Sequence, residues 1–498
     1  MSDTLPNSLN DAAAAAMAAL LASDVSPEEF TRRLLAINIE QARALDAELP
    51  ELLRACAIPR QFDADIIGVL RDAPDDAARN EALLEQIRSF SFVKPHAGGG
   101  YVFHDNVRDV LLEEWRAAPG DRYAALIQRL AALYLQRGEE ALEIESFEVA
   151  LATYSAAIEL APENGEAYSG RGKTYCQLQD YQSALGDLAK AIDLDPDDGE
   201  NYWWLGVVYY RLKNHSAALS NLTHAITIQP ENGDNYYLRG LIYYVIKDYS
   251  SMLSDFFRLA TLQPDNDGIY YWIGLANYQL KNFSAALIAF TRTIKLQTEN
   301  NPTYYWRGVT HYQLKNYPFA LIDLNRAVEL QPENGYPYCW RGQVNYQLKD
   351  YQSALADLTR AIKLLPENGE AYYWRGETYY ALKNYQSALT DLNYSIELQP
   401  ENSNSHYLRN LIRNELTSQS LKFNKINGIA KSGLNHSHNN VYPNGGVLAL
   451  ARPFPYDMTF RPFQPWVWLS SAALLIVSLM LAALALLARE PRWLLLPL

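Results

Sequence analysis

A period of 34 residues runs through the middle of this chain and limits its fold more than any other feature. Prolines, glycines and alanines each recur at this interval or at twice it. The recurring prolines and glycines are Pro162, Pro196, Pro230, Pro264, Pro332, Pro366 and Pro400, with Gly138, Gly172, Gly206, Gly240, Gly274, Gly308, Gly342 and Gly376. Such a period is typical of stacked helix pairs, because one pair alone leaves an apolar face that only its neighbour can cover.

The unit at residues 369–402 shows what each recurring residue is expected to do. Gly376 falls inside a first helix, where glycine costs about 1 kcal/mol relative to alanine, so another backbone is expected to come close. Ala388 on the second helix is the small residue expected to meet it. Asn384 lies in the turn between the helices and is expected to adopt a left-handed conformation. Pro400 ends the second helix.

This pattern resembles the tetratricopeptide repeat, whose conserved positions recur in register along the chain. In one unit they are filled by Tyr202, Gly206, Tyr209, Ala218, Leu222, Ala225 and Pro230. The resemblance divides the chain into eight units at 131–164, 165–198, 199–232, 233–266, 267–300, 301–334, 335–368 and 369–402. A capping helix is expected at about 404–417, which completes a repeat domain at 131–417. The resemblance implies a mainly α fold, an α-α superhelix with a concave surface.

In the tetratricopeptide family, several first-helix positions line the concave surface, and here the fifth is aromatic in five of the eight units and the twelfth in six. These candidate partner-binding residues are Trp203, Tyr210, Tyr237, Tyr244, Tyr271, Tyr278, Tyr305, Tyr312, Tyr346, Tyr373 and Tyr380. Aromatic rings with a polar tip are enriched at protein contact sites. The alternative is that many of these rings pack between neighbouring helices, as is expected of the tryptophans at the sixth position.

The resemblance also says which ligands this surface disfavours. Family members that hold a C-terminal carboxylate use lysine and asparagine at positions that are aromatic or small and apolar here, so an extended peptide or a partner helix fits better. The recurring arginines at the seventh position, such as Arg239 and Arg307, are expected to lie on a solvated, balanced surface. With a net charge of −14, the chain shows no basic stripe for nucleic acid.

Residues 45–120 have a different pattern, preceded by a helical segment at 1–44. Amphipathic helices lead to a turn at "KPHAGGG", a strand at "YVFH" and a helix from Asp105. This order favours a winged helix, and the wording is similar to the winged-helix segment of STAND-class signalling ATPases. The ATPase module itself is not expected, because Ala167 stands where the phosphate loop of "GRGKT" needs glycine. Residues 1–130 hold 13 basic and 21 acidic residues, a net charge of −8, which disfavours DNA.

The chain ends with an apolar stretch. Residues 466–488 are uncharged, 23 in a row, and as a helix would cover about 35 Å, enough to cross a bilayer. A flexible, basic linker is expected at 418–465 and a short tail at 489–498. No positive residue precedes the apolar run at the N-terminus, so no secretory signal is expected there. The excess of positive charge before residue 466 places the N-terminal bulk in the cytoplasm, anchored by a single C-terminal span.

Nothing in the sequence indicates catalysis, and no cofactor or metal site is expected. Cys56, Cys176 and Cys339 are far apart and are interpreted as buried thiols. We therefore expect a non-enzymatic adaptor or scaffold, tethered to the membrane, that binds a protein or peptide partner in its aromatic groove. Two alternatives remain: a DNA-linked signalling regulator that uses the winged helix, and a docking subunit for a separate enzyme.

Overall fold

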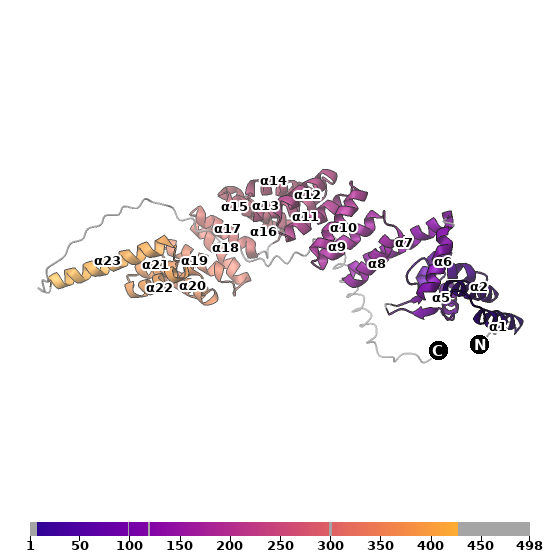
Figure 1. Ribbon diagram of the computed structural model, residues 1–498. Coiled ribbons are helices and arrows are strands. Elements are labelled where there is room, and N and C mark those ends of the chain that lie inside the picture. Colours follow the sequence, from indigo (N-terminus) through magenta and orange to yellow (C-terminus); the bar gives the residue numbers. More distant parts are fainter. Residues whose placement is uncertain (1–6, 98, 118–119, 298–300, 427–498) are drawn as a thin grey trace, which may run out of the picture. The chain divides into compact units, whose positions relative to one another are not determined.

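The computed structural model describes residues 7–97, 99–117, 120–297 and 301–426. The described part of the chain divides into two compact units, with the boundary between Asp323 and Leu324. Both are built mainly from α-helices, and the described strands form a single hairpin near the N-terminus (Figure 1).

The first unit begins with six helices and this hairpin. The elements are α1 (Asn7–Leu21), α2 (Pro27–Leu45), α3 (Leu49–Ala55), α4 (Ala64–Arg71), α5 (Ala77–Ile87), β1 (Val93–Pro95), β2 (Tyr101–Phe103) and α6 (Asp105–Ala117). The two strands are antiparallel, with Val93 opposite Phe103. The strand predicted at "YVFH" and the helix predicted from Asp105 are thus present in the structure.

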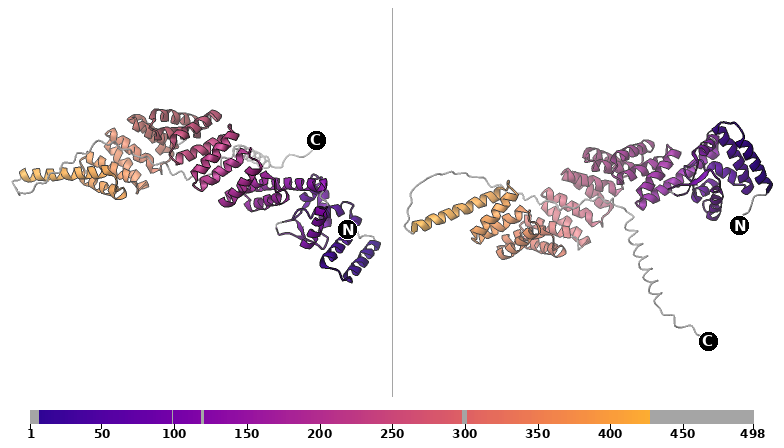
Figure 2. Two further views of the ribbon diagram at one scale, coloured as in Figure 1. Left: turned by 45° about the horizontal axis from the view of Figure 1, so that its top comes forward. Right: turned by 60° about the horizontal axis from the view of Figure 1, so that its bottom comes forward.

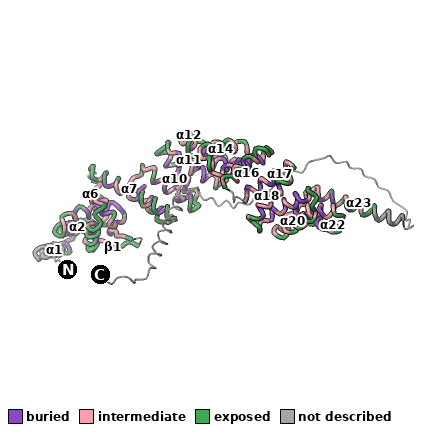
Figure 3. The backbone as a smooth tube through the Cα atoms, turned by 180° about the vertical axis from the view of Figure 1, so that it is seen from behind, coloured by how far each residue is buried: buried purple, intermediate pink, exposed green. Residues whose placement is uncertain are grey.

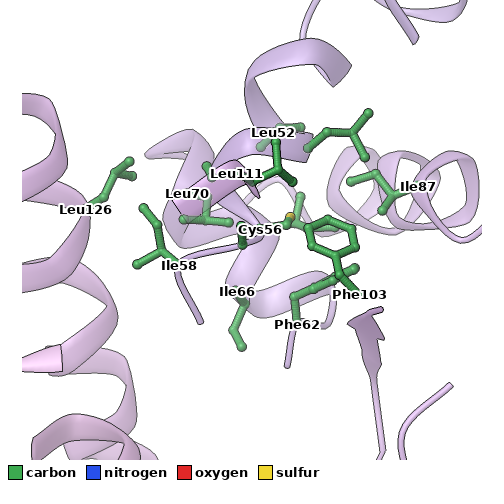
Figure 4. Packing of buried hydrophobic residues seen from close by; sticks show 14 of the residues in the cluster. Leu52, Cys56, Ile58, Phe62, Ile66, Leu70, Ile87, Phe103, Leu111 and Leu126 are labelled. Carbon is green, nitrogen blue, oxygen red and sulfur yellow. The ribbon is translucent and has the colours of Figure 1, made fainter. Parts of the chain in front are cut away.

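One buried cluster holds these N-terminal elements together. Leu52, Cys56, Phe62, Ile87 and Phe103 all point into it, from α3, α5, β2 and the loops beside them (Figure 4). The cluster continues through Leu126 and Leu130 of α7 to Ala157 of α8 and Ala167 of α9, so the N-terminal elements and the first repeats of this unit share a core.

Helix pairs follow, and their bounds repeat with the period of the sequence. In the first unit they are α7 (Asp121–Glu143) with α8 (Phe147–Leu160), α9 (Gly165–Gln177) with α10 (Tyr181–Leu194), α11 (Gly199–Arg211) with α12 (His215–Ile228), α13 (Gly233–Val245) with α14 (Tyr249–Leu262), and α15 (Asp267–Gln279) with α16 (Phe283–Leu296). Then come α17 (Asn301–Gln313) and α18 (Tyr317–Leu330), with the boundary between the units inside α18. Helices α9 to α16 stack pair on pair (Figure 2).

The second unit continues the same pattern over two further pairs. They are α19 (Gly335–Gln347) with α20 (Tyr351–Leu364) and α21 (Gly369–Ala381) with α22 (Tyr385–Leu398), followed by α23 (Ser403–Ile426). The predicted capping helix at 404–417 is present but longer. Residues 418–426, predicted to begin a flexible linker, are helical, so that boundary was wrong.

The left-handed residue in the turn between paired helices is not the one predicted. Lys383 has a φ of 60°, whereas Asn384 has a φ of −87°. Asn384 caps α22 instead, because its side-chain oxygen accepts a hydrogen bond from the Ser387 N–H at 3.3 Å. A lysine at the equivalent position is left-handed in most of the other repeats: Lys213, Lys247, Lys281, Lys315 and Lys349.

The glycine of each first helix allows a close approach, as predicted, but mainly to a different side chain. A Cβ added at Gly376 would lie 3.3 Å from the Ala388 carbonyl oxygen and 3.2 Å from Leu392 Cγ. At Gly206 the equivalent Leu222 Cγ lies at 2.8 Å. The side chain four residues after the alanine therefore fills the space that glycine leaves. Buried residues recur along both helices of each pair (Figure 3).

Within the described ranges, none of the helices combines the length and apolar composition that crossing a bilayer requires. The predicted span at 466–488, the tail at 489–498 and most of the predicted linker lie outside those ranges.

Candidate functional site

The eleven predicted partner-binding residues lie on the first helices of their repeats, from α11 to α21. Each first helix carries the fifth repeat position in its opening turns and the twelfth near its end, as with Tyr373 and Tyr380 in α21. Residues seven apart lie on the same face of a helix. The two sets of rings therefore share one face of each first helix, which we call the aromatic face.

Rings at the twelfth position pack at the joint between successive repeats. The Tyr244 ring lies 5.3 Å from Trp272 of the next first helix and 6.1 Å from Tyr249 of its own second helix. In the second unit, Tyr346 lies 5.5 Å from Trp374 and makes the equivalent contact with its own second helix. Edge-to-face ring pairs such as these hold the rings in fixed orientations.

Rings at the fifth position pack against the sixth-position tryptophan of the same helix or against the paired helix. The ring centroids of Tyr271 and Trp272 are 5.7 Å apart, and those of Tyr373 and Trp374 are 5.4 Å apart. Tyr237 instead meets Phe256 of α14 edge to face at 5.8 Å. Rings of the aromatic face are therefore held by other rings of the same unit.

Burial separates the predicted residues into two groups. Tyr305 is 1% exposed and Tyr278 is 8% exposed, so their assignment to a partner-binding surface was wrong for the structure as packed. The other nine are half-buried and reach the surface. Trp306 and Trp340 are buried, which confirms the packing role predicted for the sixth position at these two residues.

In the second unit, tyrosine hydroxyls on the aromatic face contact carboxylates two helices further along the chain, on α21 and α23. Tyr346 donates to Glu377 Oε1 at 3.3 Å, and Tyr380 donates to Glu415 Oε1 at 3.2 Å. Burial raises the pKa of Tyr380, and the negative charge of Glu415 raises it further. The Tyr380 hydroxyl therefore stays protonated and remains a donor. The second oxygens of Glu377 and Glu415 are both buried without a hydrogen-bond partner. Buried carboxylate oxygens of this kind favour a cationic donor.

The seventh-position arginines do not lie on a solvated surface, contrary to the sequence prediction. Five of them form a two-pronged ion pair with an aspartate sixteen residues later, on the second helix of the same repeat, whereas Arg137 of the first repeat pairs with Asp63 and Asp65. Arg239, for example, donates to the two carboxylate oxygens of Asp255 at 2.9 and 2.6 Å. The other pairs are Arg171–Asp187, Arg307–Asp323, Arg341–Asp357 and Arg375–Asp391. The aspartates are buried, so these pairs fix the two helices to each other.

A sequence signal for these ion pairs was present. Where arginine is missing at the seventh position, aspartate is also missing sixteen residues later: Leu205 is matched with Asn221, and Ile273 with Ala289. Apart from Arg137, which is followed by Thr153, arginine and aspartate are present or absent together at this spacing, and that indicates contact between the two positions.

Family models for tetratricopeptide repeats match residues 172–213, 199–232 and 341–403. The chain carries tetratricopeptide repeats. Both units contain matched repeats, and each matched range lies on helix pairs of the observed array. None of these family models covers residues 45–120, so the winged-helix interpretation of that segment remains a prediction.

Solved structures, two of them described as tetratricopeptide repeat proteins, are similar to parts of the chain. A repeat protein from Parabacteroides merdae is 19% identical, with a TM-score of 0.40, over 50% of this chain and 98% of its own. YrrB, described as having an unusual peptide-binding site, is 22% identical, with a TM-score of 0.34, over 38% and 97%. Pseudomonas aeruginosa PilF is 19% identical, with a TM-score of 0.37, over 43% and 97%. Comparison with curated proteins gives no match.

The cysteines are free and buried, as predicted. Burial raises the pKa of Cys176 to about 11 and that of Cys339, on the first helix of a tetratricopeptide repeat, to about 12. Burial also raises the pKa of Cys56 in the N-terminal core. Since the thiolate is the reactive form, these raised pKa values lower the reactivity of the buried thiols.

Proposed function

We propose that this chain is a scaffold, without catalytic activity of its own, that binds a peptide or helix of a partner protein on its aromatic face. Tetratricopeptide repeats support a role in protein–protein interaction. The observation that carries the finer proposal is the set of nine half-buried rings on this face, each held in place by neighbouring rings or helices. A surface ordered before binding loses little side-chain entropy on association, which favours affinity.

The carboxylates of the second unit define which side chains the partner brings. Glu377 and Glu415 each have a buried oxygen without a hydrogen-bond partner, beside the rings of Tyr346 and Tyr380. A lysine or arginine would pair with the charge of these half-buried carboxylates and also lie against the rings. We therefore propose that the partner segment combines basic and apolar side chains in this part of the array.

Selection of peptides from a random displayed library tests this proposal. Peptides that bind the full chain are expected to be enriched in lysine and arginine beside apolar residues. Glu377→Gln is expected to lower the affinity for the selected peptides about tenfold, because it removes the negative charge that pairs with their basic side chains. Tyr373→Ala is expected to do the same by removing ring contact.

Glu367→Gln is the matched control, since it removes the same charge from the exposed turn before α21. Its affinity for the selected peptides is expected to equal that of the unchanged chain. Equal affinity of Glu377→Gln and Tyr373→Ala for these peptides, with helicity retained, would place the binding surface elsewhere.

We further propose that residues 466–488 anchor the protein to a membrane and leave the N-terminal bulk in the cytoplasm. The support is the uncharged run of 23 residues and the basic residues that precede it. The full chain is expected to remain in the membrane pellet after alkaline extraction, and a chain truncated after residue 465 is expected in the supernatant. Release of the full chain by alkali would contradict the anchor.

We also propose that residues 45–120 form a winged helix that contacts protein. Support comes from the order of α3 to α5, the β1–β2 hairpin and α6. The candidate recognition helix α5 holds Glu81 and Glu85 against Arg79, and Arg79 is already paired with Asp46. A helix of this charge repels phosphates, so DNA is the less favoured partner.

A further inference from the structure

A cavity of about 420 Å³ lies in the first unit, where the N-terminal elements meet the first repeats. Its walls come from the loop after α3 and from α6, α7 and α8. Tyr123 and Ile127 contribute a ring and an apolar surface, and three arginines, Arg60, Arg108 and Arg116, also line it. None of these residues belongs to the aromatic face.

Arg108 lacks the partners that a half-buried guanidinium normally has. Its Nε is buried without a hydrogen-bond partner. The Nη2 atom of Arg108 donates a hydrogen bond to the Ile58 carbonyl oxygen at 3.4 Å. Within the described ranges, Arg108 forms no ion pair. Burial lowers the pKa of Arg108, and the like charges of Arg60 and Arg116 lower it further, against the opposite effect of Asp109 and Glu159. An anion in the cavity would remove this electrostatic cost.

The charge around the cavity indicates how much negative charge would be accommodated. Glu159 pairs with Arg60 at 2.8 Å and offsets one of the three positive charges. The remaining two positive charges stand out in an N-terminal region, residues 1–130, whose net charge is −8. A phosphate monoester carries about −1.5 to −2 at neutral pH, and guanidinium groups match its oxygens in pairs. A single carboxylate would leave one positive charge without a counterpart.

We propose that this cavity binds the phosphate group of a small phosphate monoester, with the organic part of the ligand against Tyr123 and Ile127. The guanidinium groups of Arg108, Arg60 and Arg116 would donate N–H groups to the phosphate oxygens. The cavity volume falls within the range of small-molecule sites. This site is independent of the partner-binding surface.

Phenyl phosphate is a suitable probe because it joins a phosphate to one ring. Its binding to the full chain, kept in nonionic detergent, can be measured by titration calorimetry at constant ionic strength. Phenyl phosphate is expected to bind and to raise the unfolding temperature, since a ligand that binds only the folded state stabilises it. Inorganic phosphate is expected to bind more weakly, and benzoate more weakly still.

Two variants and one control test the named arginines. Arg108→Leu is expected to lower the affinity for phenyl phosphate at least tenfold. It is also expected to raise the unfolding temperature of the ligand-free chain, because it removes a repulsion between like charges. Arg116→Gln changes an exposed residue, retains the fold and is expected to weaken binding several-fold. Arg33→Gln removes an exposed arginine of α2 that pairs with Glu29, and binding is expected to be unchanged.

The site is supported if phenyl phosphate binds the unchanged chain, and if this binding is lost in Arg108→Leu and reduced in Arg116→Gln. No binding of phenyl phosphate to the unchanged chain, or equal binding to Arg116→Gln, overturns it. Benzoate binding as tight as phenyl phosphate would overturn the preference for phosphate.

Discussion

Replacing Asp255 with alanine is expected to lower the free energy of unfolding of the first unit by about 3 kcal/mol, because it leaves a half-buried guanidinium without its counterion. The Asp255 side chain is 4% exposed and that of Arg239 is 16% exposed, so water replaces little of the lost interaction. The remaining described side-chain hydrogen bond of Arg239 is to Thr223 Oγ1. Chemical denaturation followed by circular dichroism measures this loss.

A neighbouring repeat shows which residues can replace both members of the Arg239–Asp255 pair. The next repeat has Ile273 and Ala289 at the two equivalent positions, and both are buried. Arg239→Ile with Asp255→Ala is therefore expected to cost on the order of 1 kcal/mol, less than Asp255→Ala alone, because no charge is left buried. A double variant less stable than Asp255→Ala would show that the pair contributes more than charge balance.

A surface pair provides the control. Glu231 and Arg258 lie 2.7 Å apart, with side chains 75% and 41% exposed. Glu231→Ala is expected to change the free energy of unfolding by less than about 1 kcal/mol, since exposed ion pairs contribute little. If it equalled Asp255→Ala, burial would not be the reason for the larger effect.

Gly274→Ala is expected to destabilise the fold by about 2 kcal/mol, although alanine normally favours a helix over glycine. A Cβ at this position would meet three atoms of the Phe290 ring, all within 2.9 Å. Phe290 is fully buried and also contacts Tyr271, so the ring cannot move aside without displacing other rings. The free energy of unfolding measures the effect.

Gly186→Ala is the matched control in another helix of the array. Gly186 lies in the middle of α10, is exposed, and an added Cβ would meet nothing within 4 Å. This variant is expected to gain up to about 1 kcal/mol from helix propensity. A Gly274→Ala protein as stable as the unchanged chain would show that the Phe290 ring tolerates the methyl group.

The repeated positions made much of the fold predictable from sequence. The helix pairs from residue 131 to 402, the glycine approach and the buried cysteines follow from residues whose roles are set within one unit. The linker boundary at residue 418 was misplaced, because α23 continues to Ile426. The turn was misassigned because Asn384 can serve two roles, and its capping hydrogen bond decided between them.

The sequence by itself determined the period, the pairing of helices and the face on which the aromatic residues lie, because these depend on spacing along one helix. The tertiary structure decided which rings reach the surface. Tyr305 and Tyr271 occupy the same repeat position, yet Tyr305 is 1% exposed and Tyr271 is half-buried. Exposure depends on side chains that packing brings from other helices, and the same is true of the partner of each arginine.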